Sequence, residues 1–147
     1  MNYAGFWRRF SASIIDGFIL TLPGLLLGGG LGNVSVGYGV HLILGFLYYP
    51  FFESSAMSAT PGKALLGMLI LTESGQRIPF KAAVVRYFSK YLSMILLFIG
   101  YFMQLFTARR QTLHDMISET VVVNQESADL NYFTAWKNQF KAVMDKL

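Results

Sequence analysis

The sequence contains no cysteine and few charged residues. Without cysteine it has no disulfide, no thiolate metal site and no cysteine nucleophile. Charged residues make up 14% of the 147 residues, against about 25% in an average soluble domain. Hydrophobic residues reach 54% and aromatic residues 16%. A domain of this size still exposes much of its area, so the composition disfavours a soluble monomer, a disordered chain and a nucleic-acid binder, and it indicates contact with lipid.

Recognisable catalytic and ligand-binding motifs are also missing. We find no HExxH, paired-histidine metal spacing, GxSxG or Walker motif. The glycine run at residues 28–32 lacks the preceding strand and the lysine of a phosphate-binding loop. The sequence therefore predicts no enzyme activity, no cofactor and no metal.

The longest uncharged stretch lies between Asp16 and Glu53. One helix over this stretch would be about 54 Å long, which exceeds the ~30 Å hydrocarbon core of a bilayer. The glycines at residues 28–30 mark the break. We therefore expect a helical hairpin of two transmembrane helices, over Arg9–Leu27 and Tyr38–Ala56.

The basic residues set the orientation of this hairpin. Arg8 and Arg9 precede the first span, the connecting loop has no positive charge, and more basic residues follow the second span. Positive charge favours the cytoplasmic side. The expected protein is a multi-pass protein of the cell (inner) membrane with a cytoplasmic N-terminus.

Residues 57–90 are expected to form a cytoplasmic insert. Thr60 and Pro61 are typical of a helix start, with threonine as N-cap and proline at the first position. Leu66–Leu71 and Gln76–Ile78 form a plausible small β-hairpin across a turn. A longer helix follows from Pro79.

A third apolar segment, Tyr91–Ala108, has two interpretations. It is long enough to cross the membrane once. Alternatively it is re-entrant, breaks at Gly100 and returns to the same side, which requires protein to cover the broken backbone. The β-branched Thr120–Val123 can pair with Leu66–Leu71 only in the re-entrant form.

Residues 125–147 form a separate tail with an amphipathic helix. Phe133, Trp136 and Phe140 recur at helical spacing on one face. Three roles remain open for this helix: it packs on its own domain, lies on the membrane surface, or docks a partner.

Two charged residues on the first helix need partners from elsewhere. Arg9 and Asp16 share a face two turns apart, but helical side chains lean toward the N-terminus, so Arg9 points away from Asp16. A carboxylate near the membrane is a functional candidate by default. Either Asp16 holds helices together by pairing with Arg86 or Lys63, or it handles ions or protons.

Further candidates lie near the ends of the apolar segments. Glu53 ends the second span, and Asp115 follows His114, whose ordinary pKa is near neutral. The complete set of ion-pair or functional candidates is Arg9, Asp16, Glu53, Lys63, Arg86, His114 and Asp115.

Three ordered blocks resemble the RDD family of small membrane proteins, which is named for one arginine and two aspartates. The blocks are residues 4–16, residues 52–68, and residues 109–123. By this resemblance Arg9 is the named arginine, and Asp16 and Asp115 are the two aspartates. The resemblance covers residues 3–124, the predicted membrane domain, and implies a membrane location; cation/proton exchange has been suggested for some members.

Three functions compete at this point. The first is a transporter component that moves ions or protons by means of membrane carboxylates. This function requires a homo-oligomer, because two or three spans cannot enclose a transport pathway alone. The alternative is a non-catalytic subunit or assembly factor of a membrane complex. An enzyme that grips a lipid phosphate with Arg86, Arg109 and Arg110 is the least favoured. The expected partners are the lipid bilayer and another copy or membrane complex, without nucleic acid.

Overall fold

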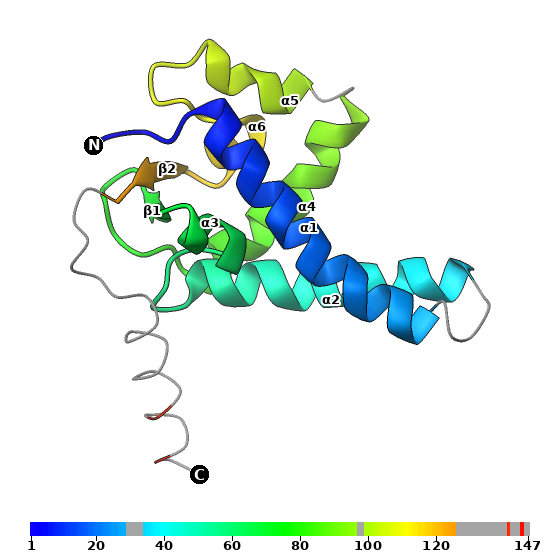
Figure 1. Cartoon of the computed structure of the whole chain (residues 1–147). Coiled ribbons are helices and arrows are strands. Elements are labelled where there is room, and N and C mark those ends of the chain that lie inside the picture. Colours follow the sequence, from blue (N-terminus) through cyan, green and yellow to red (C-terminus); the bar gives the residue numbers. More distant parts are fainter. Residues whose placement is uncertain (29–33, 97–98, 126–140, 142–144, 146–147) are drawn as a thin grey trace.

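The computed structural model describes residues 1–28, 34–96, 99–125, 141 and 145, and shows helices gathered beside one small sheet (Figure 1). The elements in chain order are α1 (Phe6–Gly28), α2 (Val34–Ser54), α3 (Pro61–Leu65), β1 (Met68–Thr72), α4 (Phe80–Ile95), α5 (Ile99–Phe102), the 3-10 turn η2 (Met103–Leu105), α6 (Leu113–Ile117) and β2 (Thr120–Asn124). The sequence predicts an all-α membrane protein with a small β-hairpin insert, and the structure confirms a mostly helical chain with one two-stranded antiparallel sheet.

The two long helices agree with the predicted helical hairpin. α1 and α2 pack against each other and begin and end within a few residues of the predicted spans (Figure 1). Within the described residues, no single helix is both long and apolar enough to cross a membrane. Only α4 taken together with residues 99–105, at a bend of 114°, meets that criterion.

The sheet joins two segments that lie far apart in the sequence. β1 pairs antiparallel with β2, from Met68 opposite Asn124 to Thr72 opposite Thr120. The predicted local hairpin is reduced to one antiparallel bridge between Leu71 and Arg77, and the main partner of β1 is β2, the pairing that the sequence allowed for Thr120–Val123. The β-branched run of β2 offers five paired residues, which explains why it outcompetes the short segment after the turn.

This pairing bears on the third apolar segment. Strands of one ladder lie on the same side of any membrane, so a single crossing between β1 and β2 is incompatible with the fold. The predicted break position was wrong, since Gly100 lies inside α5 and the helix is interrupted after Ile95. Gly100 instead permits close packing, because a Cβ there would lie 2.7 Å from Ser93 Oγ.

The start of α3 follows its sequence signals and docks on α1. Thr60 is the N-cap and accepts a hydrogen bond from Lys63 N at 3.4 Å, and Pro61 occupies the first turn, as predicted. The next residue, Gly62, lies so close to α1 that a Cβ would stand 2.8 Å from Asp16 Oδ1 and closer still to the Ala12 carbonyl. A glycine is therefore required at this crossing.

The interior is divided between a small apolar core and a larger polar one. The apolar core joins the N-terminal segment, the sheet and α4 through Ala4, Ala12, Met68, Ile70, Ile78, Ala83 and Val122. Buried charged side chains fill the space between α1, α2, α4 and α6. Buried charges are rare in proteins unless they are paired, so this polar interior is the candidate site.

Two sequence-based expectations lie largely outside the described residues. These are the loop at residues 29–33 and the amphipathic helix within residues 125–147. The boundary between the two predicted parts, 1–124 and 125–147, coincides with the end of β2 at Asn124. The division itself stays a prediction.

We predict that Gly62→Ala destabilises the protein by about 1–3 kcal/mol, the usual cost of forcing a methyl group into a packed interior. Gly17→Ala is the matched control, since a Cβ at Gly17 would meet nothing within 4 Å. Thermal unfolding of both variants in detergent measures the difference. Equal midpoints would contradict the close approach of α3 to α1.

Candidate functional site: a buried ion-pair network

Arg86 of α4 is the centre of the polar interior. It is 1% exposed. Its Nε donates to Glu53 Oε2 at 3.1 Å, and its Nη1 donates to Asp115 Oδ1 and to Thr120 Oγ1, the latter at 2.5 Å. One guanidinium thus joins the end of α2 to α6 and β2. Arginine suits this position because its planar fork serves two carboxylates at once.

Glu53 forms salt bridges with three cationic side chains, which come from two elements, α3 and α4. Lys63 Nζ of α3 lies 2.8 Å and Lys90 Nζ of α4 lies 3.3 Å from Oε1, while Arg86 occupies Oε2. Lys90 Nζ also lies 3.8 Å from the centroid of the Tyr49 ring, a cation–π contact. Glu53 is completely buried, so these cations are what allow its charge to be buried.

Asp115 closes the other end of the cluster. Its Oδ2 accepts from Arg9 Nη2 at 2.6 Å and from the Thr112 backbone N–H at 3.0 Å, and Oδ1 accepts from Arg86. Arg9 Nη1 donates in turn to Gln104 Oε1 at 3.1 Å. We call the six residues Arg9, Glu53, Lys63, Arg86, Lys90 and Asp115 the ion-pair network.

Asp16 is buried beside the network but not paired with it. Its carboxylate accepts from Tyr48 Oη at 2.7 Å, Thr60 Oγ1 at 2.6 Å and Gly62 N at 2.8 Å. Among the described residues, no cation forms a salt bridge with Asp16. The expected pairing with Arg86 or Lys63 is therefore wrong, because both of those cations are directed to Glu53.

The electrostatics of Asp115 and His114 follow from this geometry. Burial alone would raise the pKa of Asp115, but the adjacent Arg86 and Arg9 guanidinium groups outweigh it and hold that pKa well below its usual range. For His114, burial dominates and holds the pKa well below its ordinary value, despite Asp115. The histidine is therefore neutral at pH 7, and its Nε2 lies 3.0 Å from Thr112 Oγ1.

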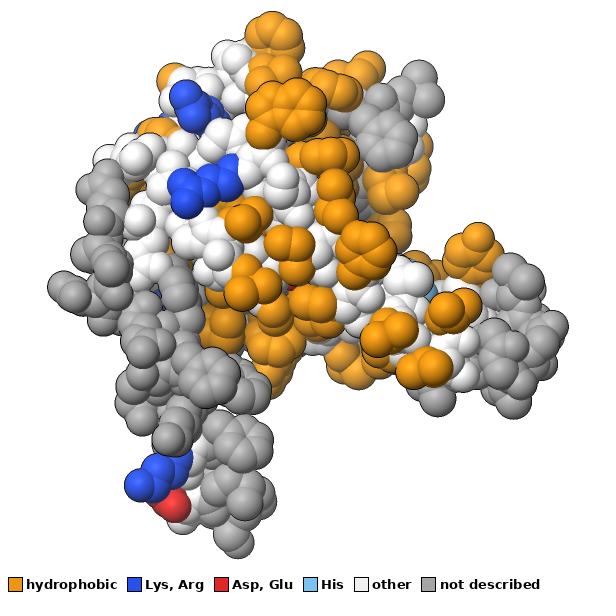
Figure 2. All heavy atoms as spheres, in the orientation of Figure 1, with side chains coloured by type: hydrophobic (Ala, Val, Ile, Leu, Met, Phe, Trp, Pro, Cys, Tyr) orange, Lys and Arg blue, Asp and Glu red, His pale blue; other side chains and the backbone are white. Residues whose placement is uncertain are grey.

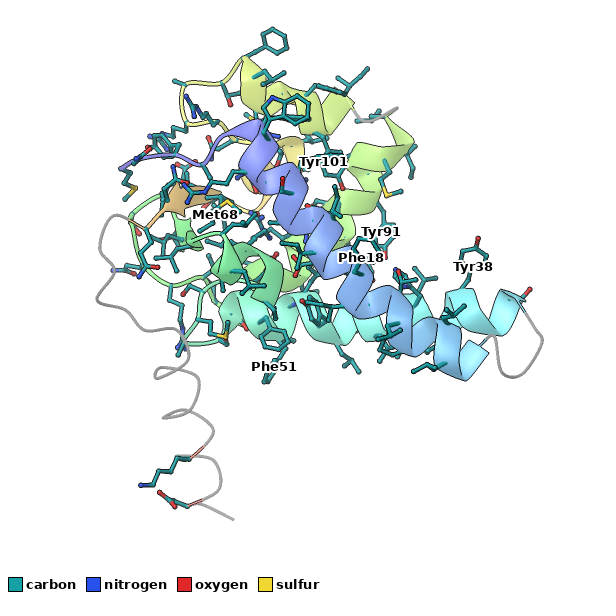
Figure 3. The ribbon with its side chains drawn as sticks, viewed as in Figure 1. Phe18, Tyr38, Phe51, Met68, Tyr91 and Tyr101 are labelled. Carbon is teal, nitrogen blue, oxygen red and sulfur yellow. The ribbon has the colours of Figure 1, made fainter. Side chains whose placement is uncertain are left out.

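A cavity of about 530 Å³ adjoins the network. Arg9, Lys63, Arg86, Lys90, Asp16 and His114 contribute its polar wall. Aromatic side chains make the rest of the wall, among them Phe6 and Phe10 of α1 and Tyr101 and Phe102 of α5 (Tyr101 is labelled in Figure 3). Within the described residues, no group of three histidine or acidic side chains is arranged to hold a metal ion.

The structure brings together all seven residues singled out in the sequence. Lys90 was missed as a member of the network, although its spacing of one helical turn from Arg86 places both on one face of α4. Tyr48, Thr112 and Gln104 were also missed, because nothing in their sequence surroundings distinguishes them from other polar residues. By contrast Arg109 pairs with Glu73 at the surface, at 2.6 Å, and does not converge with Arg86.

Comparison with known proteins identifies the family to which the chain belongs. A model of the RDD family matches residues 3–119. The chain therefore belongs to the RDD family, as the three sequence blocks indicated. Arg9, which the resemblance equates with the arginine of the family name, binds Asp115 within the network, while Asp16 lies beside the network on the same cavity wall without a salt bridge among the described residues.

Several relatives have been found by sequence comparison. "Uncharacterized protein YxaI" of Bacillus subtilis is 31% identical over 82% of this chain and 96% of its own length. "Uncharacterized membrane protein YteJ" of the same organism is 25% identical over 84% of this chain and 82% of its own. A "Proline-rich antigen homolog" of Mycobacterium tuberculosis is a longer protein. It is 33% identical over a region that covers 61% of this chain and 36% of that protein's own length. No solved structure matches the chain.

We predict that Arg86→Met lowers the free energy of unfolding by about 3–5 kcal/mol, since it leaves two buried carboxylates short of a counter-charge. Lys90→Met should cost much less, because Glu53 keeps Lys63 and Arg86. Lys81→Met, on the exposed face of the same helix, is the control. Thermal unfolding in detergent ranks the three variants, and a harmless Arg86→Met would refute the central position of this guanidinium.

We predict a loss of stability below pH 6.5 that depends on His114. The unfolded imidazole takes up a proton there, whereas the folded one, with its lowered pKa, does not. Stability should fall by up to about 1.4 kcal/mol per pH unit. His114→Gln should flatten this dependence relative to the unsubstituted chain. An unaltered slope in His114→Gln would rule out the histidine as its source.

Proposed function

We propose that the chain is a small multi-pass membrane protein, with a cytoplasmic N-terminus, that serves as a non-catalytic subunit or assembly factor of a membrane complex. Support for the membrane comes from large exposed apolar side chains on α1, α2, α4 and α5. On the face shown in Figure 2 they gather over α1, α2 and α5, and two groups of basic side chains lie beside them, toward the sheet. In Figure 3 Tyr38 and Phe51 project from α2 away from the other elements.

Family membership and the name of the relative YteJ, a membrane protein, agree with this location. An apolar surface of this extent is typical of contact with lipid or with other membrane helices. Such a surface would also allow a second copy or another subunit to pack against the helices.

The observation that favours a subunit over a transporter is the neutralisation of Glu53 and Asp115 by cations of the same chain. A carboxylate that carries a transported cation must be able to bind it. Here the oxygens of Glu53 receive Lys63, Lys90 and Arg86, and those of Asp115 receive Arg86 and Arg9. These side chains occupy the places a transported cation would need.

Proton-coupled transport remains the second candidate, and one observation favours it. Within the part of the chain that the structure describes, the hydrogen-bond donors to Asp16 are all neutral, and Asp16 lies on the wall of the cavity. A carboxylate in that position is free of a competing cation and can exchange a proton. In this case Asp16, rather than Glu53 or Asp115, would be the exchanging group.

We predict that the protein stays with the membrane after an alkaline carbonate wash, and that liposomes containing it alone show no sodium or proton flux. Asp16→Asn tests the alternative, with Glu73→Gln at the exposed surface as the control. Both variants are first checked for unchanged thermal unfolding. Flux that Asp16→Asn abolishes and Glu73→Gln retains would overturn the subunit proposal in favour of transport, and release by carbonate would overturn the membrane location.

A further inference from the structure

The cavity beside the ion-pair network has a cationic wall. Among the six residues of the network, four are cations, Arg9, Lys63, Arg86 and Lys90, and two are acids, Glu53 and Asp115. Asp16 supplies one further negative charge from the same wall. One positive charge is thus left over at a site shielded from water. A buried surplus charge is costly, and one monoanion would neutralise it.

The remaining cavity wall is mainly aromatic and apolar, and Ser13, Gln104, Thr112 and His114 also line it. The rings of Phe6 and Phe102 stack at 5.6 Å between centroids, and Phe10 stacks on Phe6 at 6.1 Å. These stacked aromatic rings give a hydrated inorganic ion no hydrogen-bond partner, but they can pack against a hydrocarbon chain. The volume of about 530 Å³ lies within the range of small-molecule sites, roughly 300–1,000 Å³.

The cavity reaches the surface within the exposed apolar region. Phe10 and Phe102 line it and are also half exposed, at 50% and 48%. The neighbouring Ile14 is exposed to a similar degree. A ligand that enters here comes through apolar surroundings and meets the cations at the inner end, where Lys90 is the most exposed member of the network, with 17% of its side chain accessible.

We propose that this cavity binds the anionic head of a membrane amphiphile, a lipid phosphate or a fatty-acid carboxylate, with the head at Lys90, Lys63 and Arg9 and the chain along Phe6, Phe10 and Phe102. Charge-assisted hydrogen bonds from lysine and arginine to such oxygens are among the strong ones in proteins. The entry route rests on the membrane location proposed above. The cationic wall and its apolar continuation are independent of that location.

The test uses the purified full chain in detergent, with native mass spectrometry to count bound molecules. The probes are dioleoyl phosphatidic acid, oleate, dioleoyl phosphatidylcholine and inorganic phosphate. We expect one equivalent of phosphatidic acid or oleate, and at least about tenfold weaker binding of phosphatidylcholine. Lys90→Gln should weaken binding about tenfold, as expected for one charge-assisted hydrogen bond. Lys81→Gln, which removes the same charge from the exposed face of α4, should leave it unchanged.

Ser13→Trp supplies a second variant that does not alter the network. Ser13 is exposed, lines the cavity, and donates only to the Arg9 carbonyl at 3.0 Å. An indole there should block the cavity and abolish binding while thermal unfolding stays unchanged.

A preference for phosphatidic acid identifies a phosphate head and a preference for oleate a carboxylate, and either upholds the proposal. Binding of inorganic phosphate without either amphiphile would overturn it, as would equal losses in Lys90→Gln and Lys81→Gln or equal binding of phosphatidylcholine. If the protein resists carbonate extraction but binds no anionic amphiphile, the proposed binding site is wrong and the proposed membrane location still stands.

Discussion

The fold depends on the position of one buried guanidinium between two carboxylates. Arg86 connects Glu53 at the end of α2 with Asp115 of α6, and Arg9 and Lys63 bring α1 and α3 to the same cluster. Buried ion pairs are poor sources of net stability but strongly penalise a lost partner. The network therefore fixes which helices meet and in which register, whereas the small apolar core holds the sheet and the N-terminal segment in place.

The distribution of polarity explains why such a network is needed. Apolar side chains cover α1, α2, α4 and α5 on the outside, while charged groups are buried between the same helices. If the outside faces lipid, little hydrophobic driving force is left to hold the helices together, and polar contacts between them take a larger share. The surplus positive charge beside the cavity then offers a binding site for an anion.

The sequence allowed much of this arrangement to be predicted, and its failures have physical causes. The lengths of α1 and α2, the cap at Thr60 and the pairing of the two strands follow from local signals of charge, capping and β-branching. The family resemblance singled out Arg9, Asp16 and Asp115, and the structure buries all three. The partner of Asp16 was wrong because three neutral donors satisfy it, and the hydroxyl of Tyr48 and the backbone N–H of Gly62 have no signature in a sequence. The role of Gly100 was wrong because glycine serves close packing as well as chain breaks.

Arg9 and Asp115, 106 residues apart, form the buried pair that closes the network. A double-mutant cycle with Arg9→Met, Asp115→Asn and the combined variant measures that pair directly, through the free energy of unfolding in detergent. We expect the two single losses to be strongly non-additive, with a coupling of about 2–3 kcal/mol, at the upper end for residues in contact. Additive losses within about 0.5 kcal/mol would contradict the account.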